Sequence, residues 1–89
     1  MSHPRFTVVP GANFDNQLAA IWLKDRNVTA AIDRLDEVLQ ILPDQAGTSF
    51  EYDGRSYWYI RHNGFQVIYQ IMSDDCLVQL HDIRPLVGS

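Results

Sequence analysis

Residues 55–84 have the sequence RSYWYIRHNGFQVIYQIMSDDCLVQLHDIR, and this stretch decides the fold of the 89-residue chain. Apolar and polar residues alternate on both sides of two turns, which predicts three consecutive β-strands. The first turn is Asn63-Gly64, a pair that suits a hairpin turn in which both central residues need positive φ. The second turn falls at Asp74-Asp75, where short polar residues separate two apolar runs. A three-stranded meander is the expected result.

A two-residue turn at Asn63-Gly64 fixes the register, because side chains alternate between the two faces of a sheet. His62 then lies opposite Phe65, and the pairing continues outward to Tyr57 opposite Gln70. The face predicted to be core carries Trp58, Ile60, Phe65, Val67, Tyr69 and Ile71. The face predicted to be polar and aromatic carries Arg55, Tyr57, Tyr59, Arg61, Gln66, Ile68 and Gln70. If the second turn also has two residues, Val78 and Leu80 join the first face, and Gln79 and His81 join the second. Asp82 would fall on the apolar face, so we expect a bulge or a strand end near it.

The first half of the chain predicts one strand and two helices. Residues 5–9 alternate as a short strand, and Pro10-Gly11 breaks it. A helix follows, which we expect to be capped by Asn13 and to end between residues 24 and 27. Its apolar stripe is Phe14, Leu18, Ile21 and Trp22.

The second helix is expected to start at Asn27 or Thr29 as N-cap and to stop at Pro43. Its apolar stripe is Val28, Ala31, Ile32, Leu35, Val38, Leu39 and Leu42. Residues 44–53 are interpreted as a polar connection. The whole chain, 1–89, therefore predicts a single α+β domain in which two helices pack on one face of a mainly antiparallel, four-stranded sheet, in the order β-α-α-β-β-β.

Composition limits the classes of function. The net charge of −4 argues against bulk electrostatic binding to nucleic acid, although a local basic patch remains compatible with it. No apolar run is long enough for a membrane helix, and residues 1–9 lack the apolar segment of a signal peptide. A single cysteine, Cys76, allows no internal disulfide and favours a cytoplasmic location. No cluster has metal-ligand spacing, and we expect no cofactor.

The order of elements and three segments resemble the RelE/ParE superfamily of type II toxin–antitoxin toxins. These segments are AAIDRLDEVLQILPDQAG, FQVIYQIMSDDCLVQL and HDIR. Leu39, Pro43 and Gly47 match the superfamily's Leu-x-x-x-Pro-x-x-x-Gly pattern at the end of a helix. The superfamily also shows a strand of the type Tyr-Arg-Val-Ile-Tyr, an acidic turn, a Val-rich strand and an Ile-Arg pair. The matching residues here are Val67, Ile68, Tyr69, Asp74, Asp75, Val78, Ile83 and Arg84.

The resemblance implies a toxin that is neutralised by a cognate antitoxin and acts on the ribosome as an mRNA endonuclease. The alternative that it implies is a ParE-like inhibitor of DNA gyrase, or a toxin fold that binds without catalysis. Gln66 stands where the nucleases often carry an arginine, and five residues follow Arg84 where they often carry a late tyrosine or histidine. These departures favour the alternative. The action on the ribosome remains our leading hypothesis.

Cleavage of RNA through its 2′-hydroxyl needs a base, an acid and a cation near the phosphate. The predicted catalytic residues are Arg61, His81 and Arg84. The predicted RNA- or partner-binding residues are Arg55, Tyr57, Tyr59 and Gln66. Exposed pairs of this kind also stabilise a sheet without any ligand, and a homodimer through the exposed sheet is a third alternative.

Overall fold

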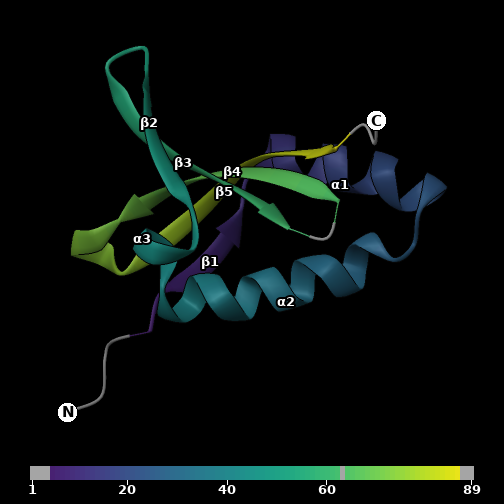
Figure 1. The fold of residues 1–89 in the computed structure, drawn as a ribbon, viewed down its shortest axis with the longest axis horizontal. Coiled ribbons are helices and arrows are strands. Elements are labelled where there is room, and N and C mark those ends of the chain that lie inside the picture. The colour runs from purple at the N-terminus through teal and green to yellow at the C-terminus, as the bar shows by residue number, and fades with distance from the viewer. Residues whose placement is uncertain (1–4, 63, 87–89) are drawn as a thin grey trace.

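The computed structural model describes residues 5–62 and 64–86 and shows one sheet with helices packed against it (Figure 1). The elements are β1 (Thr7–Pro10), α1 (Ala12–Lys24), α2 (Val28–Ile41), α3 (Pro43–Ala46), β2 (Thr48–Tyr52), β3 (Arg55–His62), β4 (Phe65–Met72) and β5 (Leu77–Pro85). A 3₁₀ turn, Ser73–Asp75, joins β4 to β5. Among the described helices, none is both long and apolar enough to cross a membrane.

The sheet has five strands in the order β1-β5-β4-β3-β2, with β1 parallel to β5 and every other pair antiparallel. The α+β class and the mainly antiparallel sheet are therefore confirmed, but the predicted count of four strands is wrong. The extra strand, β2, lies in the stretch interpreted as a polar connection. Asp53 and Gly54 both have positive φ, 54° and 75°, and form a tight turn between β2 and β3. Pro43 also begins the short α3 directly after α2.

The predicted register of the hairpin is confirmed over five pairs, from Trp58 opposite Tyr69 to His62 opposite Phe65. Gly64 has φ 85°, as the turn requires, while Asn63 lies outside the described residues. Beyond the 3₁₀ turn, Met72 pairs with Leu77, which is the register that a two-residue turn at Asp74-Asp75 predicts.

The irregularity expected near Asp82 is a β-bulge. Tyr69 pairs with Leu80 but Ile68 pairs with Asp82, so His81 is an extra residue in β5. The bulge places Asp82 beside Ile68 and turns Ile83 into the core, where it is 1% exposed. A carboxylate thereby avoids the apolar face.

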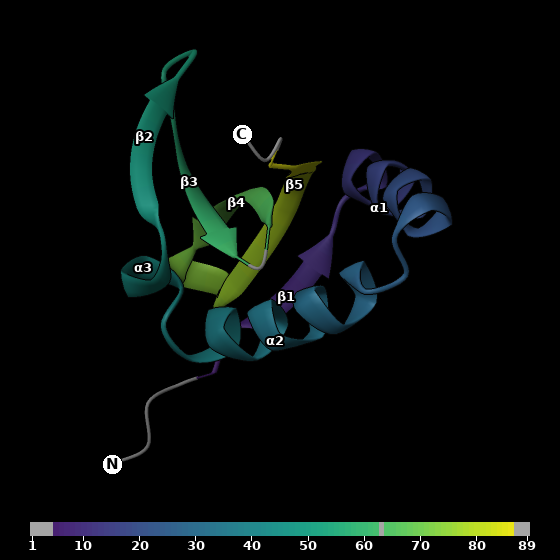
Figure 2. The ribbon, with the colours of Figure 1, turned by 45° about the vertical axis from the view of Figure 1, so that its right-hand side comes forward.

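Both long helices cover the same face of the sheet (Figure 2). Their buried side chains pack with β4 and β5 in one core, which consists of Phe14, Val28, Ala31, Leu35, Leu39, Phe65, Val67, Tyr69, Val78, Leu80 and Ile83. Three residues of the predicted stripes, Trp22, Val38 and Leu42, are instead about two-fifths exposed, at 41%, 40% and 45%. The guanidinium of Arg26 covers the Trp22 ring at 4.9 Å.

The helix caps differ from the predicted ones. The N-cap position of α1 is Gly11, and Asn13 lies inside the helix with its side chain directed to β5. At α2 the N-cap position is Asn27, as predicted, but its side chain makes no capping hydrogen bond. Instead, Asp25 Oδ1 accepts a hydrogen bond from the Asn27 backbone N–H at 3.0 Å.

Tyr69 ties the sheet to the segment that leads into β2. Its buried hydroxyl donates to the Pro43 carbonyl at 2.7 Å. A side chain at Gly47 would collide with this hydroxyl and with the Tyr59 carbonyl, so the close approach requires glycine. Burial, together with the nearby Asp44 carboxylate, raises the pKa of Tyr69 to about 12.

We predict that Tyr69→Phe lowers the free energy of unfolding by about 1–2 kcal/mol, because the buried Pro43 carbonyl loses its donor. Tyr57→Phe, on the exposed side of the sheet, should change it by less than about 0.5 kcal/mol. Urea denaturation measures both. Equal costs in the two variants would contradict the assigned role of the Tyr69 hydroxyl.

The pH dependence of the free energy of unfolding gives a second test of the Tyr69 hydroxyl. A phenol whose folded pKa exceeds its unfolded value of 10 keeps its proton in the native state, so the native state loses stability as the pH rises from 10 towards 12. In Tyr69→Phe, the free energy of unfolding should depend less on pH between pH 10 and 12, which urea denaturation at several pH values measures.

Candidate functional site on the open face of the sheet

The face of the sheet away from α1 and α2, called here the open face, carries all the predicted site residues. Pairing of Tyr59 with Ile68, of Arg61 with Gln66 and of Gln66 with Arg84 places these side chains on one side. β2, a strand that the sequence did not predict, adds Thr48, Phe50 and Tyr52 to this face.

An aromatic cluster lies at the β2 side of the open face. The Phe50 ring is 5.8 Å from Tyr57 in a stacked arrangement and 5.9 Å from Tyr59 in a tilted one. The Arg61 guanidinium lies 5.8 Å from the centre of the Tyr59 ring. A hollow of about 420 Å³ is lined by Phe50, Tyr59, Arg61, Gln66 and Ile68. Flat rings beside a guanidinium suit an unstacked nucleobase with its phosphate.

Arginines flank Gln66 in a row across three strands. Gln66 pairs with Arg61 on β3 and with Arg84 on β5, so the two arginines stand about 10 Å apart at their backbones. Arg61 Nε donates to Gln66 Oε1 at 3.3 Å, and Arg84 Nε donates to Asp82 Oδ2 at 3.0 Å. The Arg84 side chain is 71% exposed, so it can reach a ligand without leaving a buried site.

His81, the bulge residue, belongs to a second group. Its Nε2 lies 2.7 Å from Gln70 Oε1, and its ring meets the Tyr57 ring edge-on at 5.6 Å. Gln70 Nε2 donates to the Ser56 carbonyl at 3.4 Å, so the Gln70 oxygen faces His81. An amide oxygen can only accept, and the proton of the His81 ring therefore lies on His81 Nε2. Nδ1 is then the basic nitrogen. Burial lowers the pKa of His81 below 6.5, which keeps the ring neutral at pH 7.

The structure therefore divides the predicted catalytic residues between two groups. Arg61 and Arg84 belong to the row around Gln66, whereas His81 contacts Tyr57, which lies four residues, or about 13 Å, from Arg61 along β3. Arg55 lies further out, opposite Tyr52 beside the β2–β3 turn. In the structure, the Arg61 guanidinium contacts Gln66 and Tyr59, whereas the His81 ring contacts Gln70 and Tyr57.

Charge is segregated between the layers. Of the chain's 11 acidic residues, Asp82 lies on the open face, while the other ten lie on helices, in turns or linkers, or on the opposite side of β2. The arginines of the open face are Arg55, Arg61 and Arg84. Three positive charges and one negative charge give this face a net +2 in a chain of net charge −4. This local excess offers a site for an anionic partner.

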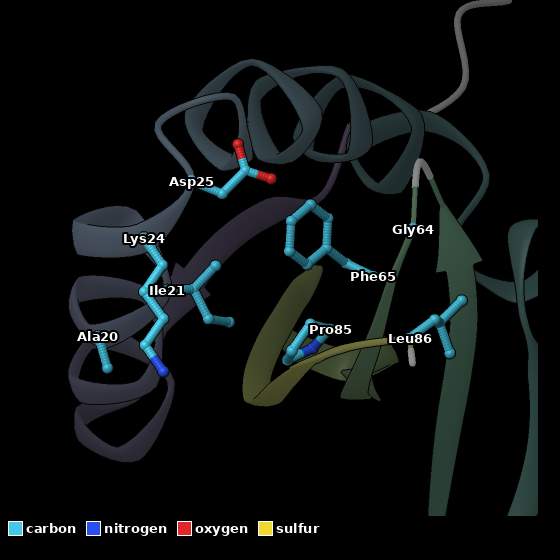
Figure 3. Close-up of a pocket in the computed structure, with 8 residues that line it drawn as sticks. All are labelled: Ala20, Ile21, Lys24, Asp25, Gly64, Phe65, Pro85 and Leu86. Carbon is cyan, nitrogen blue, oxygen red and sulfur yellow. The ribbon is translucent and has the colours of Figure 1, made fainter. Parts of the chain in front are cut away.

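A separate hollow of about 510 Å³ lies between α1 and the ends of β4 and β5 (Figure 3). It is lined by Ala20, Ile21, Lys24, Asp25, Gly64, Phe65, Pro85 and Leu86. None of the predicted site residues is in this set. Its lining is mainly apolar, so it provides packing surface, whereas the polar and aromatic groups gather on the open face.

Metal binding finds no support in the part of the chain that the structure describes. Over residues 5–62 and 64–86, no three His, Cys, Asp or Glu side chains come together as a ligand set. Cys76 is partly buried next to the 3₁₀ turn, with φ 49°.

The helical layer and the five-stranded sheet together make up a fold that is shared with a solved structure. Among solved structures, a chain of the toxin–antitoxin complex RelBE2 from Mycobacterium tuberculosis is similar over 91% of this chain and 98% of its own, with a TM-score of 0.80 and 15% identity. No family model and no curated protein sequence matches the chain. The likeness confirms the fold that the resemblance to RelE/ParE toxins predicted.

We predict that Gln70→Glu raises the pKa of His81 by about 1–3 units, because a carboxylate would replace the neutral oxygen 2.7 Å from Nε2. NMR titration of the imidazole measures the shift. Gln66→Glu makes the same charge change beside Arg61 and should leave His81 close to its wild-type value. Similar shifts in both variants would show that the His81–Gln70 contact is not what raises the pKa of His81.

Proposed function

We propose that this protein is the toxin component of a type II toxin–antitoxin module and acts on translation as a ribosome-dependent mRNA endonuclease. The observation that carries the proposal is the open face, where arginines and stacked aromatic rings gather in an otherwise acidic chain. The RelBE2-like fold supports both a toxin role and a cognate antitoxin as partner. An action on ribosomes implies a cytoplasmic location.

The proposed reaction assigns a role to each group of the open face. His81 Nδ1 takes the proton from a 2′-hydroxyl, whose oxygen attacks the adjacent phosphorus. Arg61 and Arg84 stabilise negative charge on the phosphate oxygens. The bond to the 5′-oxygen breaks, and this oxygen takes a proton from solvent. The products are a 2′,3′-cyclic phosphate and a 5′-hydroxyl, while Phe50, Tyr57 and Tyr59 stack bases and Arg55 contacts a more distant phosphate.

The separation of His81 from Arg61 gives the ribosome a role in this proposal. In the protein alone, the proposed base His81 contacts Tyr57, which lies about 13 Å along β3 from the phosphate-binding Arg61. A messenger strand held in a bent conformation by the ribosome would present its 2′-hydroxyl to His81 and the adjacent phosphate to the released arginine side chains. This separation supports the proposed dependence on the ribosome.

Cell-free translation with the purified protein, followed by primer extension along the messenger, tests the nuclease. Wild-type protein should produce cuts that require the ribosome. Arg61→Ala should reduce cutting by about 10²–10³-fold and His81→Ala by about 10²–10⁴-fold. The same variants should lose the ability to inhibit growth.

Arg34→Ala provides the matched control, because it removes an arginine from the exposed surface of α2. It should cut the messenger like the wild type. An intact messenger with normal protein yield, or full toxicity in both open-face variants, would refute the nuclease and its site.

A second candidate is a non-enzymatic toxin of the ParE type that binds DNA gyrase. Two observations favour it: Gln66, a neutral amide, occupies the centre of the arginine row, and His81 lies in a different group from Arg61. Neither feature weakens the open face as a binding surface, since aromatic and arginine side chains are those enriched at protein interfaces.

This candidate predicts that the protein inhibits supercoiling by purified gyrase. Arg61→Ala should lose this inhibition, and Arg34→Ala should retain it. A gel assay of plasmid topology measures it. Unchanged supercoiling at excess protein would remove gyrase as the target, and a ribosome-dependent nuclease should give that result.

A further inference from the structure

Strand β5 is longer than the strand that pairs with its outer edge. β1 ends at Pro10, opposite Leu80, whereas β5 continues to Pro85. The last backbone contact between the two segments is the Gly11 N–H, which donates to the Leu80 carbonyl at 2.9 Å. Beyond this point the chain turns into α1, and among the described residues no strand lies beside the edge of β5 that carries the bulge.

Two side-chain amides of α1 take the place of that strand. Asn13 Nδ2 donates to the His81 carbonyl at 3.0 Å, and Gln17 Oε1 accepts from the Ile83 N–H at 3.0 Å. The two residues are four apart in α1, so they lie on the same face of the helix, one turn after the other. One amide donates and the other accepts, as successive groups of a strand would.

The contacts with α1 fix the unusual backbone of the bulge. The carbonyls of the consecutive residues Leu80 and His81 both point to the α1 side, where Gly11 and Asn13 meet them. In a regular strand, consecutive carbonyls point to opposite edges. Asn13 thus satisfies the carbonyl that the extra residue turns outward, and Gln17 holds the backbone two residues further on.

The bulge in turn orients the side chains of the open face. His81 reaches Gln70 and Tyr57 because the extra residue turns its ring towards β4 and β3. We propose that Asn13 and Gln17 are positioning residues that fix the direction and tautomer of His81 through the β5 backbone. Their effect on cleavage rests on the function proposed above.

A purely structural role in attaching α1 is the competing explanation. Phe14, Leu18 and Ile21 already pack α1 into the core, so removal of single amides should leave the helix in place. Asn13 is exposed, which makes a substitution there compatible with folding. The test therefore needs a readout that follows the His81 ring and does not respond to stability.

The experiment measures the ring-nitrogen chemical shifts of His81 in the full chain at pH 8, by NMR. Wild-type protein should show the single Nε2–H tautomer that the Gln70 contact requires. Asn13→Leu and Gln17→Met, which remove the donor and the acceptor, should give a mixture of both tautomers. Gln17→Glu keeps an oxygen acceptor for the Ile83 N–H and should retain the wild-type pattern, which gives a result even where Gln17→Met folds poorly.

Folded Asn13→Leu protein with the wild-type tautomer would overturn the proposal, as would loss of the single tautomer in Gln17→Glu. Cleavage assays on the same proteins separate the two proposals. If the RNA cleavage proposal also holds, Asn13→Leu should cut about 10-fold more slowly, in line with the loss of part of a general-base contribution. Loss of the single tautomer in a protein that never cuts RNA would leave the positioning role intact and refute only the nuclease.

Discussion

The burial of both Leu80 and Ile83 is the constraint on which the rest of this structure depends. The two side chains are three residues apart in one strand, where a period of two would send them to opposite faces. An extra residue resolves the conflict, and its position decides which polar groups reach the open face. Asp82 and Arg84 do so because Ile83 is turned into the core, whereas His81 faces that side as the neighbour of the buried Leu80. The apolar face and the candidate site are thus set by the same irregularity.

The layered distribution of charge follows from the same division of faces. α1 and α2 present acidic and basic residues to solvent, with acidic ones in excess, and the acidic turns lie at the edges of the sheet. The open face retains arginines and aromatic rings. A net charge of −4 therefore says little about the partner, because a polyanion approaching the open face meets positive charge while one approaching the helices is repelled. Charge placement orients an anionic partner even though the total charge opposes its approach.

The predictable parts of the fold were those governed by local periodicity. β3, β4 and β5 follow from strict alternation and an Asn-Gly pair, and the conflict at Asp82 was sufficient to predict a bulge or a strand end near it. β2 was missed because its five residues are mostly exposed and give a weak alternation, although the Asp53-Gly54 pair was a usable signal for a second hairpin. Asn13 matched the preference for a helix cap, but a tertiary contact with His81 determines where its side chain goes.

The same distinction explains the site. The register alone placed Tyr59, Arg61 and Gln66 together, since pairing follows from the turn. The contribution of Phe50 depended on the missed strand, and that of Gln17 on how α1 crosses β5, which no spacing in the sequence specifies. Interactions within a hairpin were accessible to sequence reasoning, whereas those between layers were not.

Gln66 shows how the two functional alternatives differ in physical terms. A third arginine at this position would stand about 5 Å from Arg61 and Arg84, and like charges directly opposite one another destabilise a sheet. The amide instead accepts from Arg61 and holds it beside Tyr59, while Asp82 holds Arg84. A binding protein can use both arginines in these positions. A nuclease must release them towards one phosphate. The exposed contact between Arg61 and Gln66 breaks at little cost, whereas release of Arg84 leaves the buried Asp82 carboxylate without its partner. The arginines of the open face are therefore held in positions that suit binding, and the proposed nuclease requires in addition that Arg84 leave Asp82.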